Sequence, residues 1–176
     1  GRVLAFQELR LDTDVWVKGQ PFDLSELLGG DESLISRFQG GSMLIARLAP
    51  VDYHRFHFPL DCTPGVVTLQ NGPLYSVSPV ALKRNMRYLT ENKRAITLLK
   101  TAKRGEVAYI EVGATHVGSI HQTFTSGAPY KAGDEKGYFS FGGSCLILLF
   151  EKGAIEFAAD LIENTNKGIE TLVQMG

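Results

Sequence analysis

The sequence predicts a mainly β fold of the α+β class, in one domain that spans residues 1–176. Two observations carry this prediction. The chain has 176 residues, of which 44% are hydrophobic, which is enough for one core and too little for two comfortable domains. Its 19 glycines separate short apolar runs rich in Val, Ile, Leu, Tyr and Phe, and such runs between turn residues are typical of strands.

Strands are expected wherever these apolar runs fall. Each run is only a few residues long, and glycine, proline and polar residues between the runs mark the turns. In chain order, the predicted strands are 3–6, 15–17, 43–48, 65–69, 95–99, 107–112 and 146–150.

One or two short helices are expected beside the strands. Residues 23–30 read Asp-Leu-Ser-Glu-Leu-Leu-Gly-Gly, with a polar start and a glycine stop, which suits one or two helical turns. Partial helical spacing recurs at 160–163 and at 169–173, but the polar segment 164–168 interrupts it.

The charge of the chain argues against nucleic acid as a partner, because 18 basic residues stand against 19 acidic ones. The window 83–104 differs, since it holds eight basic residues and a single acidic one, Glu91. Such a window suits contact with anionic lipid head groups, and the alternative is an ordinary solvated surface of strands and turns.

Cysteine content and hydropathy bear on the compartment. Cys62 and Cys145 form neither a disulfide framework nor a metal-type Cys-x-x-Cys pair, so a reducing compartment is expected. No apolar run approaches the roughly 18 residues of a membrane-spanning helix, although the chain can still touch a bilayer.

His54 and His57 are the first candidates for chemistry, because they stand close together between two prolines. The prolines disfavour a helix, and on a regular strand the two side chains would point to opposite sides. A single histidine acting as a general base is the less demanding function, since its ordinary pKa of about 6.5 lies near neutrality.

A zinc site on both histidines would need an irregular backbone and a third ligand. The candidates for that ligand are Asp61, His116 and His121. We expect no metal here and keep a zinc hydrolase only as an alternative.

Residues 142–144 read Gly-Gly-Ser directly before the apolar run 146–150. A serine hydroxyl in a tight turn can attack the carbonyl of the preceding residue, here Gly143. Glycine suits that position because it tolerates strained backbone angles. Gly-Gly-Ser is also an ordinary turn, so the motif alone leaves both interpretations open.

Several motifs, in order along nearly the whole chain, resemble those of the phosphatidylserine decarboxylase family. The main ones are Leu48-Ala49-Pro50-x-Asp52-Tyr53-His54-Arg55-Phe56-His57-x-Pro59, Gly113-Ala114-Thr115-x-Val117-Gly118-Ser119-Ile120 and Gly137-Tyr138-Phe139-x-Phe141-Gly142-Gly143-Ser144. Supporting matches are Val17-Lys18-Gly19, Leu27-Leu28-Gly29, Leu74-Tyr75-Ser76-Val77, Thr90-Glu91-Asn92-Lys93-Arg94 and Lys131-x-Gly133-Asp134-Glu135.

The resemblance implies a proenzyme that cuts itself between Gly143 and Ser144. His57 would deprotonate the Ser144 hydroxyl, which attacks the Gly143 carbonyl and converts the amide to an ester. Elimination and hydrolysis would then leave a covalent pyruvoyl group, the cofactor, where Ser144 stood.

The resemblance also implies the reaction and its residues. Phosphatidylserine would join the pyruvoyl group as a Schiff base, lose CO2 and leave as phosphatidylethanolamine. His54 is the expected proton donor or substrate-positioning residue. The residues expected to contact substrate are Tyr53, Phe56, Gly142 and Cys145.

One residue of the family pattern is missing. The self-cleavage triad resembles the Asp, His and Ser of serine proteases, and its aspartate is expected just before Gly1. The far end, Met175-Gly176, also stops short of the family pattern. We therefore expect a trimmed catalytic core that processes itself inefficiently, with Ser144 intact and activity lost.

Further expectations follow from the resemblance. The fold should be a barrel-sandwich-like β fold with Ser144 at the mouth of a pocket. The protein should contact anionic membrane peripherally, at the cytoplasmic face, and a homo-oligomer stays open. The alternatives are a pyruvoyl-dependent decarboxylase of a soluble amino acid, the zinc hydrolase and a non-catalytic lipid-binding relative.

Overall fold

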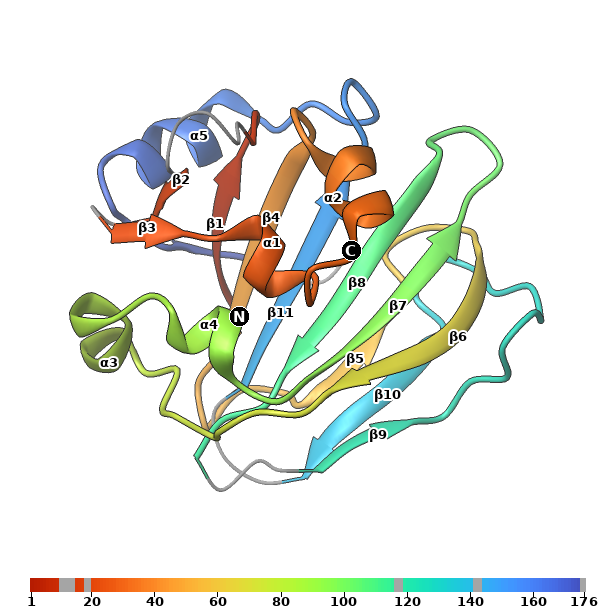
Figure 1. Ribbon diagram of the computed structural model, residues 1–176, viewed down its shortest axis with the longest axis horizontal. Helices are drawn as coiled ribbons and strands as arrows, with labels where there is room; N and C mark the ends of the chain where they lie inside the picture. The colour runs from red at the N-terminus through yellow and green to blue at the C-terminus, as the bar shows by residue number, and fades with distance from the viewer. Residues whose placement is uncertain (10–14, 18–19, 116–118, 141–143, 175–176) are drawn as a thin grey trace.

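The computed structural model describes residues 1–9, 15–17, 20–115, 119–140 and 144–174 (Figure 1). Its strands are β1 (Arg2–Phe6), β2 (Val15–Val17), β3 (Gln20–Phe22), β4 (Ser42–Leu48), β5 (Arg55–His57), β6 (Thr63–Gln70), β7 (Arg94–Lys100), β8 (Glu106–Val112), β9 (Ser119–Gln122), β10 (Glu135–Ser140), β11 (Ser144–Phe150) and β12 (Thr171–Leu172). Its helices are α1 (Leu24–Leu27), α2 (Glu32–Phe38), α3 (Pro79–Arg84), α4 (Tyr88–Glu91) and α5 (Ala159–Asn166).

The main layer is a seven-stranded antiparallel sheet in the order β12-β1-β4-β11-β8-β7-β6. Pairing is in register across it, so a single row of partners crosses all seven strands. This row is Leu172, Arg2, Arg47, Cys145, Val112, Arg94 and Gln70. The segments that continue beyond the row, 48–54, 71–78, 113–115 and Ser144, therefore lie at one end of the sheet, which we call the Ser144 end.

Two hydrophobic cores form on the two faces of this sheet. On one face Met43, Ile45 and Ile147 pack with the short helices. On the other face Leu48 and Leu148 pack with the aromatic residues of a second, three-stranded sheet in the order β5-β10-β9. The mainly β prediction is confirmed, and the sheets pack as layers; among the described strands neither sheet closes into a barrel.

The apolar runs located the long strands correctly. The seven predicted ranges coincide with β1, β2, β4, β6, β7, β8 and β11. The strands that the sequence did not reveal are short or polar, as in Ser119–Gln122, or lie between prolines, as in Arg55–His57. Their pairing in the second sheet depends on partners distant in sequence rather than on a local apolar pattern.

The described residues contain five helices, where the sequence predicted one or two. The predicted helix at 23–30 is α1, and Asp23 caps it by accepting from the Glu26 N–H at 3.0 Å. Several of the other helices are also only a few residues long, which is too short for a periodic pattern to show in the sequence. Polar side chains cap two of them, Asp31 on α2 and Ser78 on α3. No helix in the described ranges is both long and apolar enough to cross a bilayer.

The C-terminal expectation was wrong in its boundaries. Helix α5 continues through Asn166, into the segment that was expected to interrupt it, and residues 169–173 contain β12 rather than a helix. Strand β12 pairs with β1, and Ala5 N–H donates to Thr165 Oγ1 of α5 at 2.9 Å. Contacts with β1 therefore decide the secondary structure of the C-terminal segment, which its own sequence pattern did not predict.

The basic residues of 83–104 do not share one surface. Arg94 is buried and donates to the carbonyls of Glu26 and Leu27 at 2.5 and 2.7 Å. Arg87 pairs with Glu26 at 2.9 Å and with Glu91 at 3.3 Å. The other six basic residues fall at opposite ends of β7, with Lys83, Arg84 and Lys93 near the Ser144 end and Lys100, Lys103 and Arg104 at the far end.

A buried ion pair joins the two sheets. Lys136 of β10 is fully buried, and its Nζ donates to Glu111 Oε1 at 2.5 Å, to Gln122 Oε1 at 2.8 Å and to Thr97 Oγ1 at 3.0 Å. A β-bulge between Glu135 and Gly137 interrupts pairing with β5 at this point. Burial raises the pKa of Glu111 and lowers that of Lys136, while their mutual attraction opposes both shifts.

We predict that Lys136→Met destabilises the fold by about 3–5 kcal/mol, because it leaves the Glu111 carboxylate buried without its cation. Urea unfolding measures the change. The matched control is Lys131→Met, which breaks a solvent-exposed pair with Asp61 and should change the unfolding free energy far less than Lys136→Met does. Equal losses in the two variants would contradict the assignment of the buried pair as a main link between the sheets.

Candidate active site

Ser144 opens β11 in the middle of the seven-stranded sheet and pairs with Leu48 of β4. It is fully buried, and its Oγ has no hydrogen-bond partner among the described residues. Leaving a buried hydroxyl unsatisfied costs about 1–3 kcal/mol, so such a group calls for an explanation. A hydroxyl kept for reaction, or later replaced by a carbonyl group, is one.

Ser144 faces the second sheet. Alternate residues of a strand share a face, so Ser144 lies on the same side as Leu146 and Leu148. Those two residues pack in the core beneath the three-stranded sheet. Cys145 points the other way, into the core beneath the helices, where burial raises the pKa of its thiol to about 12.

A cavity of about 400 Å³ opens on the Ser144 side of the sheet, between β4, β11 and β5. Tyr53, Phe56 and His57 line it from the second sheet and the segment before it. Its other walls are mostly apolar, and they include Val3, Leu44, Ala46, Leu48, Leu146 and Leu148. Ser144 lies behind this wall rather than at the expected mouth, because it is fully buried and does not line the cavity, although its pairing partner Leu48 does.

Both ring nitrogens of His57 have partners. Nδ1 lies 2.9 Å from the Gly133 carbonyl oxygen, and Nε2 lies 3.0 Å from the Tyr53 hydroxyl. The Tyr53 and His57 rings also stack, with centroids 5.7 Å apart. Because a carbonyl can only accept, Nδ1 carries the proton of neutral His57 and Nε2 accepts from Tyr53. Nε2 therefore has the lone pair that a general base needs.

The Gly133 carbonyl is presented by a tight turn. Gly133 has a φ of +90°, a conformation that residues with a side chain rarely adopt. The turn is fixed by Asp134, whose carboxylate accepts from the Lys131 N–H at 2.7 Å. The motif Lys131-x-Gly133-Asp134 was visible in the sequence, but its contact with His57 was not.

His54 lies in the segment between β4 and β5 and is held there by two hydrogen bonds. Its Nδ1 lies 2.6 Å from the Asp52 carbonyl, and its own carbonyl accepts from the Phe139 N–H at 3.0 Å. Asp52 in turn accepts from the Ala49 N–H at 2.7 Å, which closes the turn between β4 and β5. His54 is half-buried and does not line the cavity.

The structure thus brings His57, Tyr53 and Phe56 to one cavity, with Ser144 behind its wall. It does not bring Cys145 there, because the side chain lies on the opposite face of the sheet. His57 makes no hydrogen bond to Ser144 in this arrangement. Gly142 and Gly143 lie outside the described residues.

The candidate zinc ligands are not assembled. Asp61 pairs with Lys131 at 2.7 Å, His121 stacks on Tyr138, and His116 lies outside the described residues. Within the described ranges, no three His, Cys, Asp or Glu side chains are grouped as a metal site would need. The zinc alternative gains no support from this geometry.

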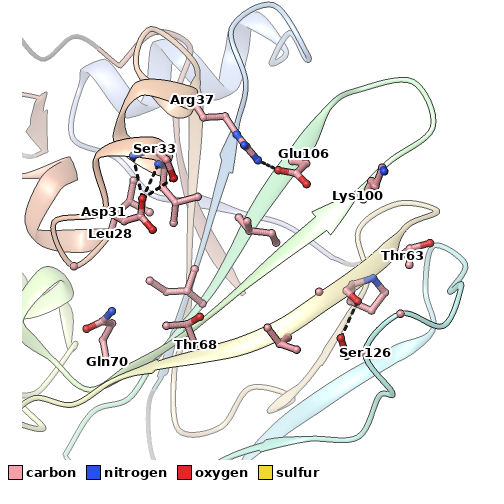
Figure 2. Close-up of a pocket in the computed structure, with 18 of the residues that line it drawn as sticks. Leu28, Asp31, Ser33, Arg37, Thr63, Thr68, Gln70, Lys100, Glu106 and Ser126 are labelled. Atoms are coloured by element: carbon pink, nitrogen blue, oxygen red, sulfur yellow. Dashed lines mark hydrogen bonds and ion pairs between the residues drawn. The ribbon is translucent and has the colours of Figure 1, made fainter.

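A larger groove of about 740 Å³ lies on the helix side of the sheet, between α2 and the strands β6 and β7 (Figure 2). Three of its polar groups make structural contacts: Asp31 caps α2, Arg37 pairs with Glu106, and Ser126 donates to the Pro64 carbonyl. None of the predicted site residues lines this groove. Its size alone does not make it the active site.

Comparison with known proteins points to one family. The sequence model of the family described as "Phosphatidylserine decarboxylase" matches residues 1–176. A phosphatidylserine decarboxylase proenzyme of Chlamydia caviae is 53% identical over 160 residues, which cover 91% of this chain and 53% of that protein. The proenzyme of Chlamydia muridarum is 49% identical over 176 residues, 100% of this chain and 58% of that protein. The chain spans about half the length of the curated relatives it matches.

We predict that neutral His57 is the Nδ1–H tautomer, because its Nδ1 donates to a carbonyl. Nitrogen-15 shifts from long-range proton–nitrogen spectra distinguish the two ring nitrogens. Tyr53→Phe should change the Nε2 shift through loss of its hydrogen bond and leave the tautomer unchanged, while Tyr130→Phe serves as a control away from the ring. A dominant Nε2–H tautomer in the wild type would contradict this geometry.

Proposed function

The chain belongs to the phosphatidylserine decarboxylase family, and from that premise we propose that its protein cuts its own backbone before Ser144 and then decarboxylates phosphatidylserine. The observation that carries the proposal is the buried, unpartnered Ser144 hydroxyl on the face where His57 lines an apolar cavity. We treat residues 1–176 as one catalytic domain.

The first reaction would use groups of the chain and, in its last step, one water molecule. Nε2 of His57 accepts the hydroxyl proton of Ser144 as Oγ attacks the carbonyl carbon of Gly143. The carbon–nitrogen bond then breaks, the Ser144 nitrogen takes a proton, and an ester joins the two residues. Loss of the Ser144 α-proton and of the Gly143 carboxylate leaves a double bond, and hydrolysis with release of ammonia leaves a ketone.

His57 must exchange a partner before this reaction. In the described geometry the Tyr53 hydroxyl occupies Nε2, and Ser144 Oγ is unpartnered. Because the Gly133 carbonyl holds Nδ1, the ring can release Tyr53 and still keep its tautomer. Tyr53 would thus hold the base in a resting position.

The triad aspartate has a natural place in this arrangement. Gly1 lines the same cavity as His57. A carboxylate on the residue that precedes Gly1 in the family pattern would therefore enter beside the imidazole. A carboxylate stabilises the charged imidazolium better than the Gly133 carbonyl does, so its presence should favour self-cleavage.

The residues around Ser144 fit a pyruvoyl group at this position, because the buried side-chain oxygen has no partner to lose and the neighbouring walls are apolar. When formed, the group supplies a ketone that condenses with an amine and accepts the electron pair left by departing CO2. Leu48, Leu146 and Leu148 would keep water out. His54, whose Nδ1–H donates to the Asp52 carbonyl, would first take up a proton at Nε2 and then deliver that proton to the substrate α-carbon.

The apolar cavity favours a lipid over a soluble amino acid as the substrate. A free amino acid would need free charged groups to hold its own carboxylate and polar side chain. Most walls of this cavity are aliphatic or aromatic, and its two charged wall residues have partners, since Arg55 pairs with Glu135 and Asp52 accepts from the Ala49 N–H. Because phosphatidylserine resides in bilayers, the protein would act as a peripheral enzyme at a membrane surface, which we place at the cytoplasmic face.

We predict a lipid adduct on the C-terminal fragment of the intact protein. After incubation with phosphatidylserine and borohydride, intact mass should show a chain split at 143/144 and a fragment from 144 onward that carries the reduced lipid. Ser144→Ala should show neither. An unsplit wild type that never reacts would contradict the proposal, and an adduct with free serine but not with the lipid would favour the soluble-substrate alternative.

We predict that the two histidines separate the two reactions. His57→Ala should slow the cut by at least about 100-fold, because it removes the general base, whereas His54→Ala should permit the cut and impair CO2 release. Intact mass follows the cut, and trapped CO2 follows the decarboxylation. Normal maturation of His57→Ala would remove His57 from the role of base.

A further inference from the structure

Large exposed apolar side chains gather at the Ser144 end of the main sheet. Val51 is 93% exposed and Val80 is 67% exposed, although both belong to residue types that are usually buried. The exposed side chains of this kind that lie beyond the row of partners or on α3, which we call the apolar tips, are Val51, Tyr53, Leu74, Tyr75 and Val80. Leu69 and Leu172 are also exposed but lie within the strands, at or next to the row. Among the described residues, the far end of the sheet carries no exposed side chain of this kind.

The register of the sheet places the apolar tips together. Val51 and Tyr53 follow β4, and Leu74 and Tyr75 follow β6, both beyond the row of partners that crosses the sheet. Four strand spacings separate β4 from β6, which amounts to about 19 Å. The tips therefore form two points of contact on one side of the molecule, at the lower left of Figure 1, where β11 begins and α3 lies.

The segment that carries Leu74 and Tyr75 is firmly attached. Asn92 Nδ2 donates to the carbonyls of Tyr75 and Gly113, each at 2.8 Å, and Thr115 Oγ1 donates to the Leu74 carbonyl at 2.9 Å. The Tyr75 ring also packs on Tyr88. The exposure of these side chains thus belongs to a fixed backbone.

The charge around the apolar tips is positive. Lys83 and Arg84 stand exposed on the last turn of α3, and Glu91 is the one acidic residue from Cys62 to Gly105 in the sequence. Three of the nearby carboxylates are paired with arginines, Glu91 and Glu26 with Arg87 and Glu170 with Arg47. Asp52 accepts from the neutral Ala49 N–H and keeps its negative charge, so the positive charge is greatest around α3.

We propose that the Ser144 end is the surface that docks on an anionic lipid bilayer. Apolar tips would enter the boundary between head groups and acyl chains, while Lys83 and Arg84 meet anionic head groups. The proposal rests on the proposed function for its biological meaning, since it turns Ser144 and the cavity of His57 toward the membrane. A lipid then reaches the cavity without crossing water.

Flotation of the intact protein with vesicles tests this surface. Vesicles of phosphatidylcholine with phosphatidylglycerol supply anionic charge and contain no substrate. We expect Lys83→Gln/Arg84→Gln to lower the partition coefficient about tenfold on these vesicles. Lys103→Gln/Arg104→Gln, which removes two charges from the same window at the far end, should change it less than about twofold.

The apolar tips are tested in the same assay. Val51→Ser/Val80→Ser should lower binding about fivefold, because less apolar area enters the bilayer. The control Val66→Ser/Ile169→Ser changes two other exposed side chains, 76% and 51% exposed, that lie away from the tips. Equal losses in variants and controls, or no loss in either tip or charge variant, would overturn the proposal; unchanged thermal unfolding confirms that each variant is folded.

Failure of the docking surface and failure of the proposed function give different results. Ser144→Ala should float like the wild type, because docking needs no pyruvoyl group. If the protein floats as expected but never forms the borohydride adduct, the proposed docking surface is supported and the proposed function is contradicted. If the protein forms the adduct with detergent-dispersed lipid but does not float, only the proposed docking surface is contradicted.

Discussion

The ion pair between Lys136 and Glu111 is the interaction on which the geometry of the site depends. Glu111 lies on β8, the neighbour of the strand that begins with Ser144, and Lys136 lies on β10, the neighbour of the strand that carries His57. The pair therefore ties together the neighbours of the two strands that would cooperate in the proposed self-cleavage. Its buried position, beneath Phe56, Tyr109 and Phe124, keeps the charges away from water and their attraction strong.

The sequence predicted six of the seven strands of the main sheet because those strands contain apolar runs, and it missed β12, which is only two residues long. It could not predict the second sheet, whose strands are short or polar, or the burial of Lys136, which depends on a bulge and on distant partners. The site residues came from motifs in a fixed order. Motifs carry no side-chain direction, which is why Cys145 was grouped with Ser144 although adjacent residues of a strand face opposite sides.

The contacts of His57 were equally hidden. Tyr53 is four residues away in sequence and Gly133 is far along the chain, yet together they occupy both nitrogens of the ring. In the proposed role of base, His57 would keep its lone pair but would have to exchange Tyr53 for Ser144 before it could act. Such an arrangement is what the proposed self-cleaving precursor would need.

The central position of β11 determines what a cut before Ser144 would produce. The short piece, from residue 144 onward, contributes the strand between β4 and β8, and its later residues return to pair with β1. Both edges of β11 are bonded along their length, and its alternate side chains fill both cores. Severing one peptide bond would therefore yield two polypeptides that remain a permanent heterodimer, inseparable short of unfolding.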